Sequence, residues 1–254
     1  MPTPFTHLDI AERMLVHDQL SPSIKALILA HKPAFMLGHV AADLQTICDI
    51  KRADTHFYRR MEALTFDAPA LMLIRYPELA KASQLTPDHR LFVAGYLAHL
   101  LFDIIWFRRI LHPHYWDVPG WQAPFEARVL SHNTLLTYLD TVALGRLPAG
   151  TGPLLAAATP HNWLPFAADE YIIRWRDMLA AQLEPGAAIQ TVIIYAERMK
   201  IAPETFQEHL ADPHWMQENV FRIVPLALLR QLLDDVVIQS IRYVENYLLE
   251  KNHD

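Results

Sequence analysis

His99 and Asp103 lie four residues apart in the almost wholly apolar stretch RLFVAGYLAHLLFDIIWFRRI, from Arg90 to Ile110. On a helix this spacing puts an imidazole and a carboxylate on one face, one turn apart. Burying either group without a partner costs on the order of a few kcal/mol. A metal ion would satisfy both groups, because neutral imidazole and carboxylate are ordinary zinc ligands. A simple His–Asp hydrogen bond inside a helix bundle is the alternative for this pair.

Three more candidate ligands precede the pair: His7 opens HLDIAERML, Asp43 ends AFMLGHVAAD, and His56 lies in THFYRR. Each alone is weak, because a histidine near a helix start commonly caps the helix and an aspartate after an apolar run commonly marks a helix end. As a set with His99 and Asp103 they suit a bundle core, where separate helices each contribute one or two inward ligands. The five residues therefore predict a metal site.

The composition bounds the class of protein. The chain has 254 residues, 52% of them hydrophobic and 20% charged, which is typical of a globular protein with a substantial core. Its net charge is -6 and it has no basic run, so no double-stranded nucleic acid is expected as a partner. Cys48 is the only cysteine, which excludes a disulfide framework and a cysteine-based zinc site.

Helical periodicity and helical punctuation run along nearly the whole chain. Ser21-Pro22 and Thr86-Pro87 each read as an N-cap followed by proline at the first helical position. No alternating strand runs occur. The sequence predicts an all-α fold: a single multi-helix bundle over residues 1–254, with the metal site in its core. The predicted helices cover roughly residues 6–15, 22–31, 33–43, 71–79, 87–110, 124–145, 167–183, 187–200, 203–210 and 217–251.

Irregular segments are predicted between these helices. Residues 44–60 show little periodicity and are expected to form a loop. The proline- and glycine-containing segment Leu147–Pro165 is the best candidate for an internal loop or a subdomain joint. Pro225 is expected to kink the first turns of the last helix. That C-terminal helix is apolar enough to pack the bundle or to form a homodimer.

The N-terminal sequence lacks the pattern of a signal peptide, so a cytoplasmic location is expected. The stretch from Arg90 to Ile110 is nearly long enough to cross a bilayer, but His99 and Asp103 near its middle oppose that interpretation. No transmembrane segment is expected. Trp106, Trp116, Trp121 and Trp163 are candidates to line an apolar cleft, with core packing the more usual role.

The motifs, taken in order, resemble the zinc-dependent phospholipase C family, which is similar in fold to the zinc-dependent single-strand nucleases. The matching pieces are HLDIAERML, FMLGHVAAD, THFYRR, GYLAHLLFD and, around His132, SHNTLLTYLDTV. They fall in the family's order with similar spacings over roughly residues 5–145. No single motif is long, so the resemblance rests on their order.

The resemblance implies a cluster of up to three zinc ions in an all-α body. One ion would be held by Asp43, His56, His99 and Asp103, all of which are present. A second would share Asp103 and use His7 together with the free N-terminus of the processed enzyme, which has no counterpart here because six residues precede His7. Such His/Asp sites also accept manganese or iron.

The third ion of the family uses two histidines and a glutamate. His132 matches one of the histidines, but Leu136 stands where the glutamate is expected and Arg109 near the other histidine. This site therefore looks dismantled. His112 or His114 could substitute, although HPHYW is also typical of a solvated turn.

The resemblance and the residues together predict a zinc hydrolase with one or two ions, acting on a small-molecule or lipid phosphate ester by metal-activated water. Asp43 would act as a ligand and as the catalytic proton acceptor. Lys51, Arg52 and Arg109 are candidates to orient the phosphate, although exposed loop charges are often only solvated. The alternative is a non-catalytic all-α binding or scaffold protein with a remnant structural metal site. Serine-hydrolase chemistry gets no support, because no G-x-S-x-G motif occurs.

Overall fold

The computed structural model describes residues 1–116, 124–184, 186 and 190–250. Every regular element in these residues is helical and none is a strand, which confirms the predicted all-α class. The α-helices are α1 Pro4–Val16, α2 Pro22–Ala30, α3 Lys32–Ala41, α4 Arg52–His56, α5 Ala68–Arg75, α6 Pro87–Trp106, α7 Phe125–Leu144, α8 Thr151–Ala156, α9 Asp169–Gln182, α10 Gln190–Met199, α11 Pro203–Ala211, α12 Pro213–Met216 and α13 Leu226–Leu248. The 3-10 helices are η1 Ala42–Thr46, η2 Arg60–Leu64, η3 Pro77–Leu79 and η4 Ala82–Gln84, and the π-helices are η5 Phe107–Trp116 and η6 Gln217–Phe221.

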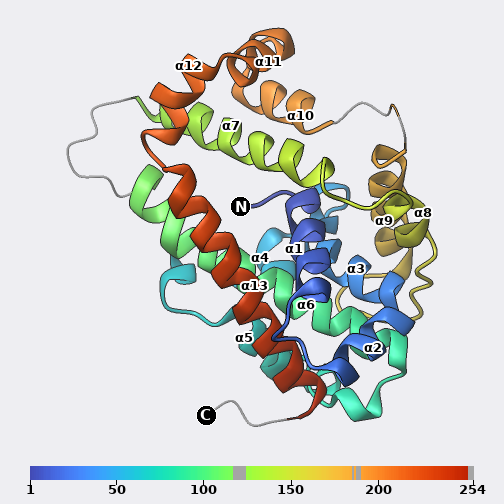
Figure 1. Ribbon diagram of the computed structural model, residues 1–254. Coiled ribbons are helices and arrows are strands. Elements are labelled where there is room, and N and C mark those ends of the chain that lie inside the picture. The colour runs from blue at the N-terminus through green and yellow to red at the C-terminus, as the bar shows by residue number, and fades with distance from the viewer. Residues whose placement is uncertain (117–123, 185, 187–189, 251–254) are drawn as a thin grey trace.

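Helix α6 forms the centre of the bundle, with α1, α3, α5 and α13 packed around it (Figure 1). It begins as the cap-and-proline signature predicts, since the Thr86 hydroxyl accepts a hydrogen bond from the backbone N–H of His89. The helical run Pro87–Trp116 is long and apolar enough to span a membrane, yet 89% of its most apolar part is buried inside the protein. The predicted role as a core helix agrees with this burial.

Two glycines let α3 and α6 approach at backbone distance. A methyl group built on Gly38 would lie 2.1 Å from the carbonyl oxygen of Phe92, and one on Gly95 would lie 2.3 Å from that of Phe35. No side chain larger than hydrogen fits at either contact. The close approach brings the backbone carbonyl of His39, on α3, to within hydrogen-bond distance of His99, on α6.

Three predicted segments differ in the structure. Residues 44–60 are not one loop, because η1 and α4 lie within or next to them and α4 carries His56. The segment Leu147–Pro165 is not an uninterrupted loop, because it contains α8, which packs against α9 and α3, whereas the subdomain joint stays a prediction. Pro225 does not kink a continuous helix: it is the N-cap residue of α13, because proline fixes φ without needing a hydrogen bond at a helix start. The single domain and a homodimer through α13 stay predictions.

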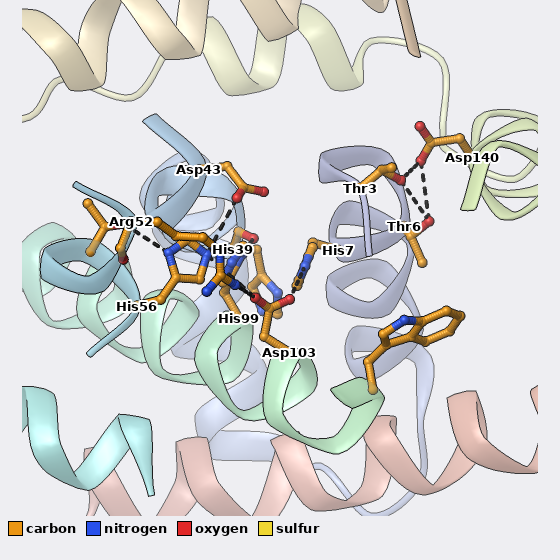
Figure 2. A network of polar contacts seen from close by, with 12 residues as sticks. Thr3, Thr6, His7, His39, Asp43, Arg52, His56, His99, Asp103 and Asp140 are labelled. Carbon is orange, nitrogen blue, oxygen red and sulfur yellow. Dashed lines mark hydrogen bonds and ion pairs between the residues drawn. The ribbon is translucent and has the colours of Figure 1, made fainter. Parts of the chain in front are cut away.

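Asp140, on α7, ties the N-terminal segment and α10 to the bundle. Its carboxylate accepts hydrogen bonds from the hydroxyls of Thr3, Thr6 and Thr191. Figure 2 shows Thr3 and Thr6 beside it, apart from the histidine-rich cluster described below. The side chain is fully buried. Burial raises the pKa of Asp140 to about 7, although the threonine hydroxyls act in the opposite direction.

Replacing Asp140 by asparagine is expected to stabilise the protein increasingly as the pH rises. The pKa of this carboxyl is about 7 in the folded state and about 4 in the unfolded state, so the stability of the wild type falls as the pH rises between those values. Above pH 7 the loss of stability is constant. A shift of that size corresponds to about 4 kcal/mol at most. Urea unfolding of both proteins at several values from pH 5 to pH 8 measures the difference. A difference that does not vary with pH would contradict the assignment.

Candidate metal centre

Five of the predicted ligands meet in the core (Figure 2). They come from four elements: His7 from α1, Asp43 from η1, His56 from the end of α4, and His99 and Asp103 from α6. Four of these side chains are at most 1% exposed, and Asp43 is 18% exposed. The spacing of His99 and Asp103 on one helix face, and the turn of α4 that directs His56 inward, bring the set together.

The ligand atoms are spaced as they would be around a metal ion. The Nε2 atom of His56 lies 3.5 Å from Asp43 Oδ1 and 3.4 Å from Asp103 Oδ2, and Nε2 of His7 lies 3.6 Å from Asp103 Oδ1. These separations are longer than good hydrogen bonds. They are close to the roughly 3.3 Å that separates two ligands at about 2.0 Å from a tetrahedral zinc ion.

Two overlapping groups of three can each surround an ion. The first is Asp43, His56 and His99, the second is His7, His99 and Asp103, and in each the ligand atoms lie within 4.8 Å of one another. His99 belongs to both groups. The cluster is therefore one compact site and not two separate ones.

Several of these atoms are buried with nothing to bind. The Nε2 atoms of His7, His56 and His99 and the Oδ1 atom of Asp103 have no hydrogen-bond partner in the described part of the chain. Each such atom costs on the order of 1–3 kcal/mol when it is left unsatisfied. A cation held by either group of three would satisfy the unpaired atoms of that group, so the donor set fits a metal ion.

The ring orientations prepare the nitrogen atoms for a metal. The Nδ1–H group of His99 donates to the backbone carbonyl of His39 at 2.8 Å, because a carbonyl oxygen can only accept. The lone pair of His99 is therefore on Nε2. His56 is held in the same way, with Nδ1 at 2.8 Å from the hydroxyl of Thr55. A second hydrogen bond of this kind is the usual means by which proteins orient a ligating imidazole.

Burial sets the protonation state of the cluster. Burial, followed by the neighbouring His99, lowers the pKa of His7 to about 4, and burial, followed by the charge of Arg52, lowers that of His56 to about 4. The rings of His7 and His99 stack at 3.8 Å, an arrangement that suits neutral imidazoles. Burial by itself raises the pKa of Asp43 and Asp103, yet contact with the facing histidines holds both pKa values below the usual range. At neutral pH these two imidazoles and two carboxylates are in the protonation state that binds a metal.

A pocket of about 900 Å³ opens beside the cluster, with Asp43, Arg52 and Tyr58 among its lining residues. Its other walls are largely apolar, with side chains from η5, α7, α9 and α10: Leu111, Trp116, Leu136, Trp175, Ile194 and Tyr195. Trp116 thus lines a cleft, whereas Trp106 and Trp163 are buried in the core and Trp121 lies outside the described residues. The pocket gives solvent and a ligand access to the edge of the metal site.

His132 does not join the five. It is buried beside Trp106, whose indole N–H donates to His132 Nε2 at 3.2 Å, and it lies in neither of the two groups. Leu136 is 2% exposed, and Arg109 forms an ion pair with Asp235 of α13 at 2.7 Å. His112 and His114 also lie outside the two groups.

Arg52 and Tyr58 both contact the cluster, although no sequence pattern singles out Tyr58 and Arg52 could equally be a solvated loop residue. Arg52 donates to the carboxylate of Asp103 at 2.9 Å, and the Tyr58 hydroxyl donates to the same oxygen at 3.3 Å. The motif RADTHFY places both near His56, but only the fold of α4 shows that they face the cluster. Lys51, the other loop cation, is exposed.

The comparisons with known proteins bear on this site. A family model described as zinc dependent phospholipase C matches residues 6–185. The matched stretch contains all five residues of the cluster and His132. Neither the curated proteins nor the solved structures contain a match to the chain.

Proposed function

Because the chain belongs to the zinc-dependent phospholipase C family, we propose that it is a zinc-dependent hydrolase that cleaves a phosphodiester bond in a lipid phosphate ester. The observation that carries the proposal is the cluster itself. Buried, unpaired nitrogen and oxygen atoms from α1, α4 and α6 converge with the carboxylate of Asp43 at the edge of a pocket that is large enough for a substrate.

Each residue of the cluster has a role in this proposal. Asp43, His56, His99 and Asp103 would hold one zinc ion, and the family resemblance assigns His7 with Asp103 to a second ion. When it is bound, zinc supplies Lewis-acid chemistry, since it polarises a phosphoryl oxygen and lowers the pKa of water toward about 7. We assign Asp43 as the acceptor of the proton of the attacking water, and its partial exposure and its place in the pocket lining support this role. Manganese or iron would suit the same ligands.

The pocket supports a lipid as the substrate class. Its apolar walls, formed by residues such as Trp116, Trp175 and Ile194, suit the glycerol and acyl portions of a lipid. Asp43, Arg52 and Tyr58 line the part of the pocket beside the cluster, where the phosphate would lie. A soluble phosphodiester fits the chemistry of the cluster but leaves these apolar walls without a role.

A scaffold protein with a remnant metal site is the second candidate. Leu136 and Arg109 favour it, because neither residue can ligate a metal where the family has a third ion. A scaffold would bind zinc for stability alone and would cleave no phosphodiester.

Metal content and hydrolysis separate the two functions. Protein purified without chelator is expected to contain one or two equivalents of zinc by elemental analysis. It is expected to hydrolyse a short-chain phospholipid, releasing the phosphorylated headgroup, and a nitrophenyl phosphodiester more slowly. Chelation should abolish both reactions and added zinc should restore them. Stoichiometric zinc without hydrolysis of either substrate would favour the scaffold, and absence of metal would refute the hydrolase.

A further inference from the structure

Arg52 is bound to the cluster through only part of its guanidinium group. Its Nη2 atom donates to Oδ2 of Asp103 at 2.9 Å and to the hydroxyl of Tyr58 at 3.0 Å. The guanidinium also lies over the Tyr58 ring, 5.0 Å from its centroid. Because Asp103 is 1% exposed and carries the charge of a carboxylate, these contacts fix the position of Arg52 (Figure 2).

The rest of the guanidinium has donors to spare. An arginine offers five N–H donors, and the hydrogen bonds of Arg52 within the described chain all use Nη2. Its Nε and Nη1 atoms are therefore available. The side chain is 34% exposed and lines the pocket together with Asp43. A fixed cation with free donors beside a metal site is suited to a phosphate oxygen, which arginine binds through charge-assisted hydrogen bonds.

The same contacts leave little room for a second metal ion. Oδ2 of Asp103 already accepts from Arg52 and Tyr58, so an ion that bridged this carboxylate would lie beside a guanidinium of like charge. His99 cannot serve two ions, since its Nδ1–H is donated to the His39 carbonyl and only Nε2 carries a lone pair. Both groups of possible ligands need His99, and because His99 offers only one lone pair, the two groups compete for one ion.

We propose that the centre holds a single zinc ion and that Arg52 supplies the second positive charge, binding a non-bridging oxygen of the phosphoryl group through Nε and Nη1. This inference rests on the proposed function and specifies how its substrate is held. It assigns Arg52 as a phosphate-binding residue. Asp103 and Tyr58 position it.

Inorganic phosphate is the probe for this role. Its affinity is measured by calorimetry for the wild type, R52Q and R52K, with the zinc content of each sample determined by elemental analysis. We expect one zinc equivalent in the wild type, which R52Q retains, and phosphate binding about 10- to 100-fold weaker in R52Q, the range for a lost charge-assisted hydrogen bond. R52K keeps the charge without the planar fork and is expected to fall between the two.

Arg59→Gln is the matched control, because Arg59 lines the same pocket and no contact links it to the five cluster residues in the described chain. It should bind phosphate as the wild type does. Equal phosphate affinity in R52Q and the wild type would overturn the proposal, as would two zinc equivalents in the wild type. Loss of zinc from R52Q would also overturn it, because Arg52 would then serve only to hold Asp103.

The zinc content of the wild type tests the proposed function, and the ratio of the two phosphate affinities tests Arg52. A wild type without zinc would refute the hydrolase, whereas a zinc-loaded R52Q that binds phosphate normally would refute only the role of Arg52. The two ideas can thus fail separately.

Discussion

Replacement of His99 by alanine is expected to remove stoichiometric zinc and to abolish hydrolysis. His99 belongs to both groups of ligands, so no arrangement of the other four residues compensates for its loss. Outer-shell partners of metal ligands are worth about 10- to 100-fold in metal affinity, and a ligand shared by the whole cluster should be worth at least the upper end of that range. Elemental analysis and zinc titration of the purified variant measure the effect.

His39→Leu is the control for this substitution. His39 is equally buried and next to the cluster, but its ring nitrogens have no hydrogen-bond partner in the described residues and it lies outside both ligand groups. Its backbone carbonyl, which orients His99, is unchanged in the variant. The leucine variant is expected to keep its zinc. A zinc-loaded alanine variant at His99, with the leucine variant also loaded, would refute the ligand assignment.

Replacement of Gly95 by alanine is expected to cost more than about 3 kcal/mol of folding free energy, at the upper end for overpacked cores. The new methyl group would lie 2.3 Å from the carbonyl oxygen of Phe35 and 3.0 Å from the backbone nitrogen of His39. Both are backbone atoms of α3, so no side chain can rotate away and the two helices must separate. Chemical denaturation measures the loss, and zinc affinity should fall with it because the separation moves His99 away from the His39 carbonyl.

Gly145→Ala is the control, at a glycine whose backbone conformation and surroundings accept a methyl group. Its φ of -68° suits any residue, and an added methyl group would meet its nearest atoms at 3.6 Å, an ordinary contact. The variant should be as stable as the wild type or up to about 1 kcal/mol more stable, because alanine restricts the unfolded chain. Equal stability of the alanine variants at Gly95 and Gly145 would contradict the close packing of α3 and α6.

The long helices and the five cluster residues could be predicted from the sequence, the helices because caps and periodicity are local patterns. Cap-and-proline pairs mark where α2 and α6 begin, and the i, i+4 spacing puts His99 and Asp103 on one face whatever surrounds them. The order of the short motifs adds Asp43 and His56 through family resemblance. These features need no knowledge of how the helices pack.

Features that depend on packing could not be predicted in this way. Residues 44–60 lack periodicity because α4 is a single turn held by its neighbours. From the sequence, Arg52 is therefore a candidate to orient the phosphate that could equally be a solvated loop residue, and nothing singles out Tyr58. His132 matches a family motif, yet its surroundings in the fold are Trp106 and Tyr115 and not the cluster. The role of Gly95 could not be predicted from its neighbours in the sequence either, because its close contact is with α3, some sixty residues away in the chain.

Because the ligands come from four separate elements, zinc binding is coupled to folding. Positions 7, 43, 56, 99 and 103 form a site only in the folded chain, so zinc binds the native state far better than the unfolded one. By mass action, each tenfold rise of free zinc above the dissociation constant then adds about 1.4 kcal/mol to the stability. The melting temperature should therefore climb with the logarithm of zinc concentration, and the fraction of chains exposed to proteolysis should rise wherever zinc becomes scarce.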